Sequence, residues 1–152
     1  SRPILVEIQA LVGRPKQGDP ARTVVGLDRT RLSMILAVLG RVGLHLGDRD
    51  VFVSAAGGVK ILEPAADLAI ALAVYSSAKR APIPAEVLAF GEIGLVGELR
   101  GVSFPSLRLK EAERHGFKRA IVPASLRETS SLELDLCKTL KEVLPRGEEM
   151  ED

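Results

Sequence analysis

The chain has 152 residues, of which 46% are apolar and 27% charged, and its net charge is +1. This length and apolar content predict one domain with a sizeable hydrophobic core. The single cysteine, Cys137, excludes an internal disulfide and a multi-cysteine zinc site, and it indicates a reducing, cytoplasmic compartment. The longest apolar run, residues 65–75, is shorter than the roughly 20 residues of a membrane span, so no membrane partner is expected.

The hydrophobic periodicity and the turn residues predict the first elements. In chain order they are a strand over residues 4–12, a Gly- and Pro-rich loop over 13–21, a second strand over 23–27 that forms a hairpin with the first, and a helix over about 30–43. Asp28 or Thr30 can cap this helix, because either side chain can accept a hydrogen bond from the first helical turn.

The remaining elements follow from the same signals. They are a strand over 50–56, an apolar helix from Pro64 to about Arg80, one or two strands over 87–101 around a Gly-rich turn, a helix from Ser106 to His115, a strand over 120–122, and a short strand followed by a helix over 132–144. Ser106 is expected to cap its helix, and Gly116 is a favourable residue after the helix end.

This order of elements predicts an α+β fold in which helices cover a mixed sheet. Residues 1–146 are expected to form the domain, and residues 147–152 an acidic tail that is frayed. Residues 1–126 hold 17 Lys and Arg against 12 Asp and Glu, whereas residues 127–152 hold 4 against 8. The body of the chain is therefore basic, which is compatible with a polyanionic partner but does not require one.

Five segments in a fixed order carry a resemblance to a known family. They are VEIQALV at residues 6–12, VGLDRTRL at 25–32, GGVK at 57–60, GEIGLVGELR at 91–100 and HGFKRAIVP at 115–123. The series resembles the C-terminal, Lon-protease-like domain of the RadA (Sms) family of bacterial DNA-repair proteins, over roughly residues 4–145. The resemblance implies a Lon-protease-like fold, also called ribosomal S5 domain 2-like, and a hexameric ring.

The resemblance also implies that the peptidase reaction is lost. Ala65 matches the position of the nucleophilic serine of Lon, and Ser106 falls near the position of its catalytic lysine. No catalytic residue is therefore expected, because a methyl group cannot replace a nucleophilic hydroxyl. An active Lon-related serine peptidase stays open as an alternative, with a relocated dyad drawn from Ser54 or Ser106 and Lys60 or Lys110.

The sequence predicts no metal or cofactor in this chain. His45 and His115 have no His or Cys at ligand spacing, and no phosphate-binding P-loop motif occurs. The glycines of residues 57–60 and of the series Gly91, Gly94 and Gly97 are interpreted as sites of tight turns and close backbone approach. The family resemblance implies that ATP and zinc bind only in upstream domains of a longer protein.

Two basic clusters are the candidate DNA-binding residues. The first consists of Arg14, Lys16, Arg22, Arg29 and Arg31, and the second of Arg108, Lys110, Arg114, Lys118 and Arg119. Arg29 and Arg31 oppose the dipole at a helix N-terminus, which suggests a carboxylate or phosphate partner. Taken alone, both clusters are compatible with an ordinary solvated surface. The resemblance favours contacts to the phosphates of single-stranded or branched DNA, which depend on salt and do not read sequence.

The predicted function is that of a non-peptidase Lon-like module of a DNA-repair ATPase. Such a module supports hexameric ring assembly and sequence-independent DNA binding in recombination and branch migration, and a RecA-like recombinase is a further expected partner. The chain itself is not expected to be an enzyme. A second alternative is an oligomerisation platform without DNA contact, which the sequence hardly distinguishes from the first.

Overall fold

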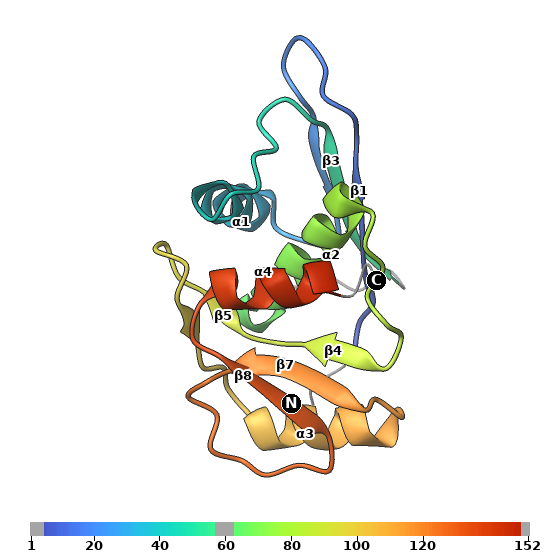
Figure 1. Ribbon diagram of the computed structural model, residues 1–152. Coiled ribbons are helices and arrows are strands. Elements are labelled where there is room, and N and C mark those ends of the chain that lie inside the picture. The colour runs from blue at the N-terminus through green and yellow to red at the C-terminus, as the bar shows by residue number, and fades with distance from the viewer. Residues whose placement is uncertain (1–4, 57–62, 150–152) are drawn as a thin grey trace.

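The computed structural model describes residues 5–56 and 63–149 and has an α+β architecture built on small sheets (Figure 1). One end of the molecule contains β1, β3 and α1, the other contains β4, β7, β8 and α3, and α2 and α4 lie between them. The α+β class predicted from the sequence is confirmed. None of the helices in the described part of the chain is long and apolar enough to cross a membrane.

The first sheet has three strands in the order β1-β3-β2: β1 (Ile8–Val12), β3 (Val51–Ala55) and β2 (Arg22–Val25). β1 is antiparallel to β3, and β2 is parallel to it. The predicted hairpin between the first two strands is therefore wrong, because β3 lies between them. Asp50 holds the connecting loop across β3: its carbonyl accepts from the Gly13 N–H at 2.8 Å and its carboxylate from the Ala21 N–H at 2.7 Å.

Two helices contribute to the core beneath this sheet. α1 (Arg29–Arg41) begins at Asp28, whose carboxylate accepts from the Arg31 N–H at 3.2 Å, so Asp28 is the cap. α2 (Asp67–Lys79) follows the 3₁₀ turn η2 (Pro64–Ala66) and is buried along most of its length. Its near-continuous apolar sequence corresponds to a central position, with β1 and β3 on one side and α4 on another.

The second sheet consists of three parallel strands, β4 (Val87–Ala89), β7 (Arg119–Pro123) and β8 (Glu133–Cys137), with β7 in the centre. α3 (Pro105–Arg114) packs Leu109 and Ala112 with Ala120 of β7, whereas Ile121 joins the main core with α2 and α4 (Leu140–Glu149). β7 is thus buried on both faces, which explains its continuous apolar run.

Residues 87–101, where one or two strands were expected, form three: β4 and the two strands of a short hairpin, β5 (Glu92–Ile93) and β6 (Leu99–Arg100). Gly97 turns this hairpin with φ +88°, a conformation that side chains disfavour. A Cβ at Gly91 would lie 3.1 Å from the Pro123 Cγ. The interpretation of this glycine series as sites of tight turns and close approach is confirmed, whereas residues 57–60 lie outside the described residues.

The start of α3 differs from the sequence prediction, and the predicted end of the domain is not tested. Ser106 is not the cap of α3, because Pro105 already occupies the first helical position and Phe104 is the N-cap. Gly116 has φ +85°, as expected for the residue after a helix end. α4 continues to Glu149, and residues 150–152 lie outside the described residues. The domain boundary at residue 146 and the frayed tail therefore stay predictions.

Candidate functional site

The position that matches the Lon serine lies in a packed backbone junction. Ala65 in η2 is 5% exposed, and its carbonyl accepts from the Gly91 N–H at 2.9 Å. The Gly91 carbonyl in turn accepts from the Leu68 N–H at 3.1 Å. The methyl group of Ala65 can act neither as a nucleophile nor as a base. The surrounding hydrogen bonds join the start of α2 to Gly91, the residue before β5.

No serine–lysine dyad is formed in the part of the chain that the structure describes. Ser54 is half-buried in β3, and Ser106 and Lys110 are exposed on α3. None of the described serine hydroxyls hydrogen-bonds to a lysine ammonium; Ser76, for example, donates to the Ala81 carbonyl at 2.6 Å. Lys60, the other candidate base, lies outside the described residues.

Two residues from Ala65, a buried carboxylate organises the same region. The Asp67 side chain is fully buried, and its Oδ1 accepts from Arg31 Nε at 2.7 Å while its Oδ2 accepts from Arg31 Nη2 and, at 3.0 Å, from the Ile93 N–H. Arg31 also lies 3.5 Å from a Glu92 carboxylate oxygen. The hydrogen bond to Asp67 raises the pKa of Arg31. Arg31, Asp67 and Glu92 thus form an ion network, the α1–α2 ion network, with Arg31 in contact with both carboxylates.

One residue of this network, Arg31, is also a predicted DNA contact. Arg31 at the N-terminus of α1 was expected to face a carboxylate or a phosphate, and within the chain its partner is the carboxylate of Asp67. Sequence reasoning missed Asp67 as a functional or structural centre. The available signal was a single acidic residue in the first turn of an otherwise apolar helix, since such a charge is buried only when it is paired.

The first basic cluster is divided between two ends of the first sheet. Arg22, at the start of β2, donates to the Leu46 carbonyl at 2.8 Å and to the Arg49 carbonyl. Lys16 lies 3.4 Å from Asp50, whose pKa is lowered by the hydrogen bond from the Ala21 N–H and by Lys16. Arg29 and Arg31 lie beyond the other end of β2, at the start of α1. The structure therefore does not bring all five residues together.

The second basic cluster lies on α3 and at the start of β7. Arg108 pairs with Glu63 at 2.8 Å, and Arg114 pairs with Glu111 at 3.1 Å. Arg119 pairs with Asp135 at 2.8 Å, and this hydrogen bond raises the pKa of Arg119. Four predicted contacts are exposed and form no ion pair with another described residue: Arg14, Arg29, Lys110 and Lys118.

Two further groups that could carry chemistry are a histidine at the end of α3 and the single cysteine. His115 lies 3.1 Å from Glu111 on the exposed side of α3, and Cys137 is buried in β8. Residues 5–56 and 63–149 contain no cluster of three or more His, Cys, Asp or Glu side chains that could hold a metal ion.

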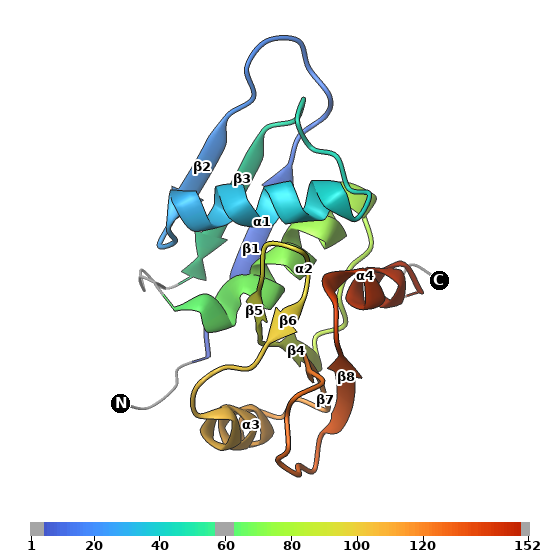
Figure 2. The same cartoon turned by 90° about the vertical axis from the view of Figure 1, so that its left-hand side faces the viewer.

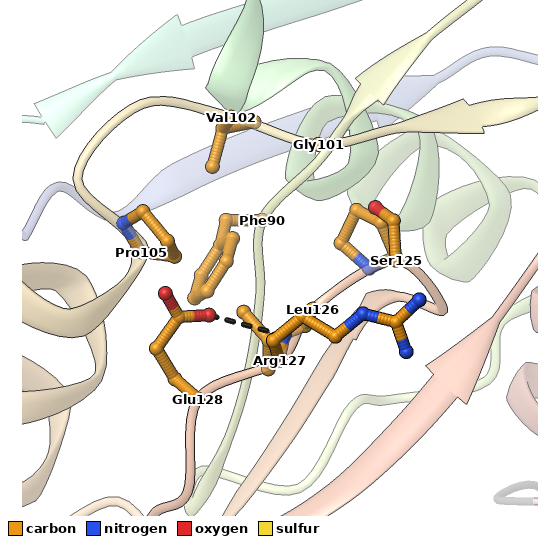
Figure 3. A pocket seen from close by; sticks show the side chains of 9 residues that line it. Phe90, Gly101, Val102, Pro105, Ser125, Leu126, Arg127 and Glu128 are labelled. Carbon is orange, nitrogen blue, oxygen red and sulfur yellow. Dashed lines mark hydrogen bonds between the residues drawn. The ribbon is translucent and has the colours of Figure 1, made fainter.

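A pocket of about 190 Å³ lies between the start of α3 and the loop after β7, and sequence reasoning did not predict it (Figure 3). Phe90, Val102, Pro105 and Leu126 supply apolar walls, and polar groups come from the loop over residues 125–128. There the Arg127 N–H donates to the Glu128 carboxylate at 3.2 Å. These apolar walls and polar groups make the pocket a candidate binding surface.

Comparison with known proteins places the chain in a family. The family model described as subunit ChlI of Mg-chelatase matches residues 14–125. DNA repair protein RadA of Haemophilus influenzae is 50% identical over 134 residues, which cover 88% of this chain and 29% of that protein. DNA repair protein RadA of Escherichia coli is 52% identical over 126 residues, 82% of this chain and 27% of that protein, and that of Aquifex aeolicus is 51% identical over 127 residues.

These relatives confirm the resemblance to the RadA family that the sequence motifs indicated. The chain spans less than a third of the length of the curated relatives it matches. The matching family model describes a chelatase subunit and not a peptidase, so the Lon-protease-like fold stays a prediction. The chain therefore belongs to the family described as subunit ChlI of Mg-chelatase, and it is similar over most of its length to bacterial DNA repair proteins RadA.

Proposed function

We propose that this chain is a Lon-protease-like module, of the ribosomal S5 domain 2-like fold, that has no peptidase activity and binds DNA through its phosphates in DNA repair. The observation that carries the proposal is the identity of about half of the residues, over four fifths of the chain, to proteins named DNA repair protein RadA. The proposal extends to recombination and branch migration, in which a DNA-bound module would act beside an ATPase.

The absence of peptidase chemistry is supported by the surroundings of Ala65. The matching residue of a Lon enzyme would need a hydroxyl and a desolvated lysine beside it. Here the side chain is a buried methyl group, and the adjacent ionisable group is the carboxylate of Asp67, already paired with Arg31. The guanidinium of Arg31 stays protonated, so it cannot act as the base that the lysine supplies in a Lon enzyme.

DNA binding is supported by the exposed cations that form no ion pair with another described residue. Arg14, Arg29, Lys110 and Lys118 are drawn from both basic clusters and are available to phosphates without breaking an ion pair between described residues. Such contacts release counterions, so affinity would fall with salt, and they would not distinguish sequences.

The remaining parts of the proposal concern the longer protein. We place the chain in a hexameric ring, with ATP and zinc bound by upstream domains and a RecA-like recombinase as a partner. A ring needs a heterologous interface that closes, in which two different surfaces of the chain meet. This chain itself would contribute assembly and DNA contact, and the chemistry of ATP hydrolysis would take place elsewhere in the protein.

One observation favours a second candidate, an oligomerisation platform without DNA contact. Six of the ten predicted DNA contacts donate hydrogen bonds within the chain: Lys16, Arg22, Arg31, Arg108, Arg114 and Arg119. These residues contribute to the fold, so hydrogen bonds within the chain already give each of them a role without DNA. The two candidates differ in what the four unpaired cations do.

A salt titration distinguishes the two candidates. Fluorescence anisotropy is measured with a labelled 20-nucleotide strand and the matching duplex, for the wild type and for Arg14→Gln, Arg29→Gln, Lys110→Gln and Lys118→Gln. Each lost phosphate contact is expected to reduce the salt slope by about 0.7 for the strand and about 0.9 for the duplex. Lys141→Gln on α4 is the matched control, because Lys141 is an exposed cation outside both clusters. Unchanged affinity and slope in all four variants would favour the platform.

A further inference from the structure

The N-terminus of α3 has apolar side chains at the two positions where polar ones stabilise a helix. Phe104 is the N-cap and Leu107 the third helical residue. In a capping box these positions hold Ser or Thr and Glu or Gln, which satisfy the free N–H groups of the first turn. Phe104 makes no side-chain capping bond, and its backbone is left-handed, with φ 55° and ψ 48°. For a bulky side chain this conformation is rare and unfavourable.

The interior of the protein does not account for these two residues. The Phe104 side chain is 57% exposed and that of Leu107 is 44% exposed. Neither belongs to the core cluster that α3 forms with β7, which is built from Leu109 and Ala112 on the opposite side of the helix. Capping preferences therefore favour polar residues at both positions, and two exposed apolar side chains lie three residues apart at this helix end.

Cationic side chains follow Leu107 along one side of the helix. Leu107, Lys110 and Arg114 stand at i, i+3 and i+7, so they form one stripe about 10 Å long. Lys110 forms no ion pair with another described residue, and Arg114 shares Glu111 with His115. The α3 outer face, defined as Phe104, Leu107, Lys110 and Arg114, thus presents an aromatic ring followed by positive charge.

We propose that the α3 outer face binds single-stranded DNA, with an unpaired base stacked on Phe104 and the following phosphates at Lys110 and Arg114. This inference rests on the proposed DNA-binding function. The stripe covers about three nucleotides at the 3.4 Å spacing of a stacked strand. A duplex offers the same phosphates, but its bases are stacked inside and cannot reach the ring, so Phe104 would contribute selectivity for unpaired strands. An acidic apolar peptide is the competing occupant.

The test removes the ring while improving the cap. Phe104→Asn supplies a capping side chain that tolerates the left-handed backbone, so the melting temperature is expected to stay equal or rise. Affinity for a labelled 15-nucleotide thymidine strand should fall at least about fivefold, since stacking on one aromatic side chain contributes that much or more. Affinity for a duplex of the same length should change less than about twofold, because only phosphate contacts remain there.

Two more variants control the experiment. Phe104→Trp keeps an aromatic ring, so strand affinity should be retained, and because the chain has no other tryptophan its fluorescence should be quenched by the strand and not by the duplex. Phe52→Thr removes a different Phe, 40% exposed on β3, and should leave both affinities unchanged.

Each outcome decides the proposal. Equal losses for strand and duplex in Phe104→Asn would overturn base stacking. If Phe104→Asn binds like the wild type while the Lys110→Gln variant loses affinity, the stacking site is refuted and the DNA-binding function stands. If the wild type binds neither probe, the proposed function fails and this inference fails with it. Tighter binding of an acidic amphipathic peptide than of the strand, lost in Phe104→Asn, would identify a protein-docking surface instead.

Discussion

At the scale of single residues, Asp67 connects three elements of the described structure. It is the one buried charged or polar residue in the described core. Its carboxylate joins the start of α1 through Arg31, the start of α2 through its own backbone, and β5 through the Ile93 N–H. A buried charge is tolerated only when it is paired and hydrogen-bonded, and this geometry meets both conditions.

Replacing Asp67 should therefore destabilise the chain far more than replacing an exposed aspartate. We expect Asp67→Ala to lower the free energy of unfolding by about 2–4 kcal/mol, since it leaves the Ile93 N–H and a half-buried guanidinium without a partner. Asp67→Asn should cost less, because its amide oxygen can still accept from Ile93. Urea denaturation measures both, with Asp19→Ala in the exposed first loop as the control. Equal stability of Asp67→Ala and Asp19→Ala would show that the network contributes nothing.

At the scale of elements, the last turn of α3 is tied to the segment that leads into β8. The Glu113 carboxylate accepts from the Ser130 hydroxyl at 2.6 Å and from the Ser131 N–H at 3.0 Å. The Ser130 oxygen in turn accepts from the Leu132 N–H at 3.1 Å. These bonds stabilise the ionised carboxylate, so the pKa of Glu113 lies below its ordinary value, with the Ser130 hydrogen bond as the main cause.

This shift predicts a pH dependence with a definite sign. A carboxylate whose pKa is lower in the folded chain than in the unfolded one stabilises the fold above the unfolded value, and the contribution is lost as pH falls through the folded value. Glu113→Gln should therefore be less stable than the wild type at neutral pH, and the difference should shrink as the pH drops below about 4.5 and through the lowered folded value. Thermal melts across this pH range measure the effect; a difference that is constant with pH would contradict it.

At the scale of the whole molecule, the most exposed apolar side chains belong to the turn of the β5–β6 hairpin. Leu95 and Val96 are 71% and 73% exposed. The turn is nevertheless held in place, because the Val96 N–H donates to the Glu98 carboxylate at 3.2 Å and the Gly97 carbonyl accepts from the Leu140 N–H at 2.8 Å. The hairpin reaches toward α1 on the side seen in Figure 2. A fixed apolar projection of this kind is typical of a contact between protein chains.

We therefore expect the chain to self-associate through this hairpin. Sedimentation at high protein concentration should show species larger than a monomer, and Leu95→Ser with Val96→Ser should shift the distribution toward the monomer without lowering the melting temperature. Leu11→Ser, on the exposed face of β1, serves as the control for loss of an exposed apolar side chain. A strictly monomeric wild type at every concentration would contradict the prediction.

Much of the local structure could be predicted because it depends on neighbours in the sequence. The cap of α1 at Asp28, the start of the α2 segment at Pro64 and the left-handed Gly116 follow from hydrogen-bonding or backbone properties of those residues. The predicted cap at Ser106 was wrong because an exposed Phe occupies the N-cap against local preference. Local rules favour a polar residue at the N-cap, and Phe104 does not follow them.

Periodicity, turn residues and ordered motifs are properties of the chain alone, and they were sufficient to predict the α+β class, the position of most helices and strands, and the resemblance to RadA. The folded structure was needed to see that β3 separates β1 from β2, that Arg31 pairs with Asp67, and that six predicted DNA contacts form hydrogen bonds within the chain. Most of these features join residues about 15 to 60 positions apart, and such pairing depends on how the elements pack around a shared core, which local patterns do not encode.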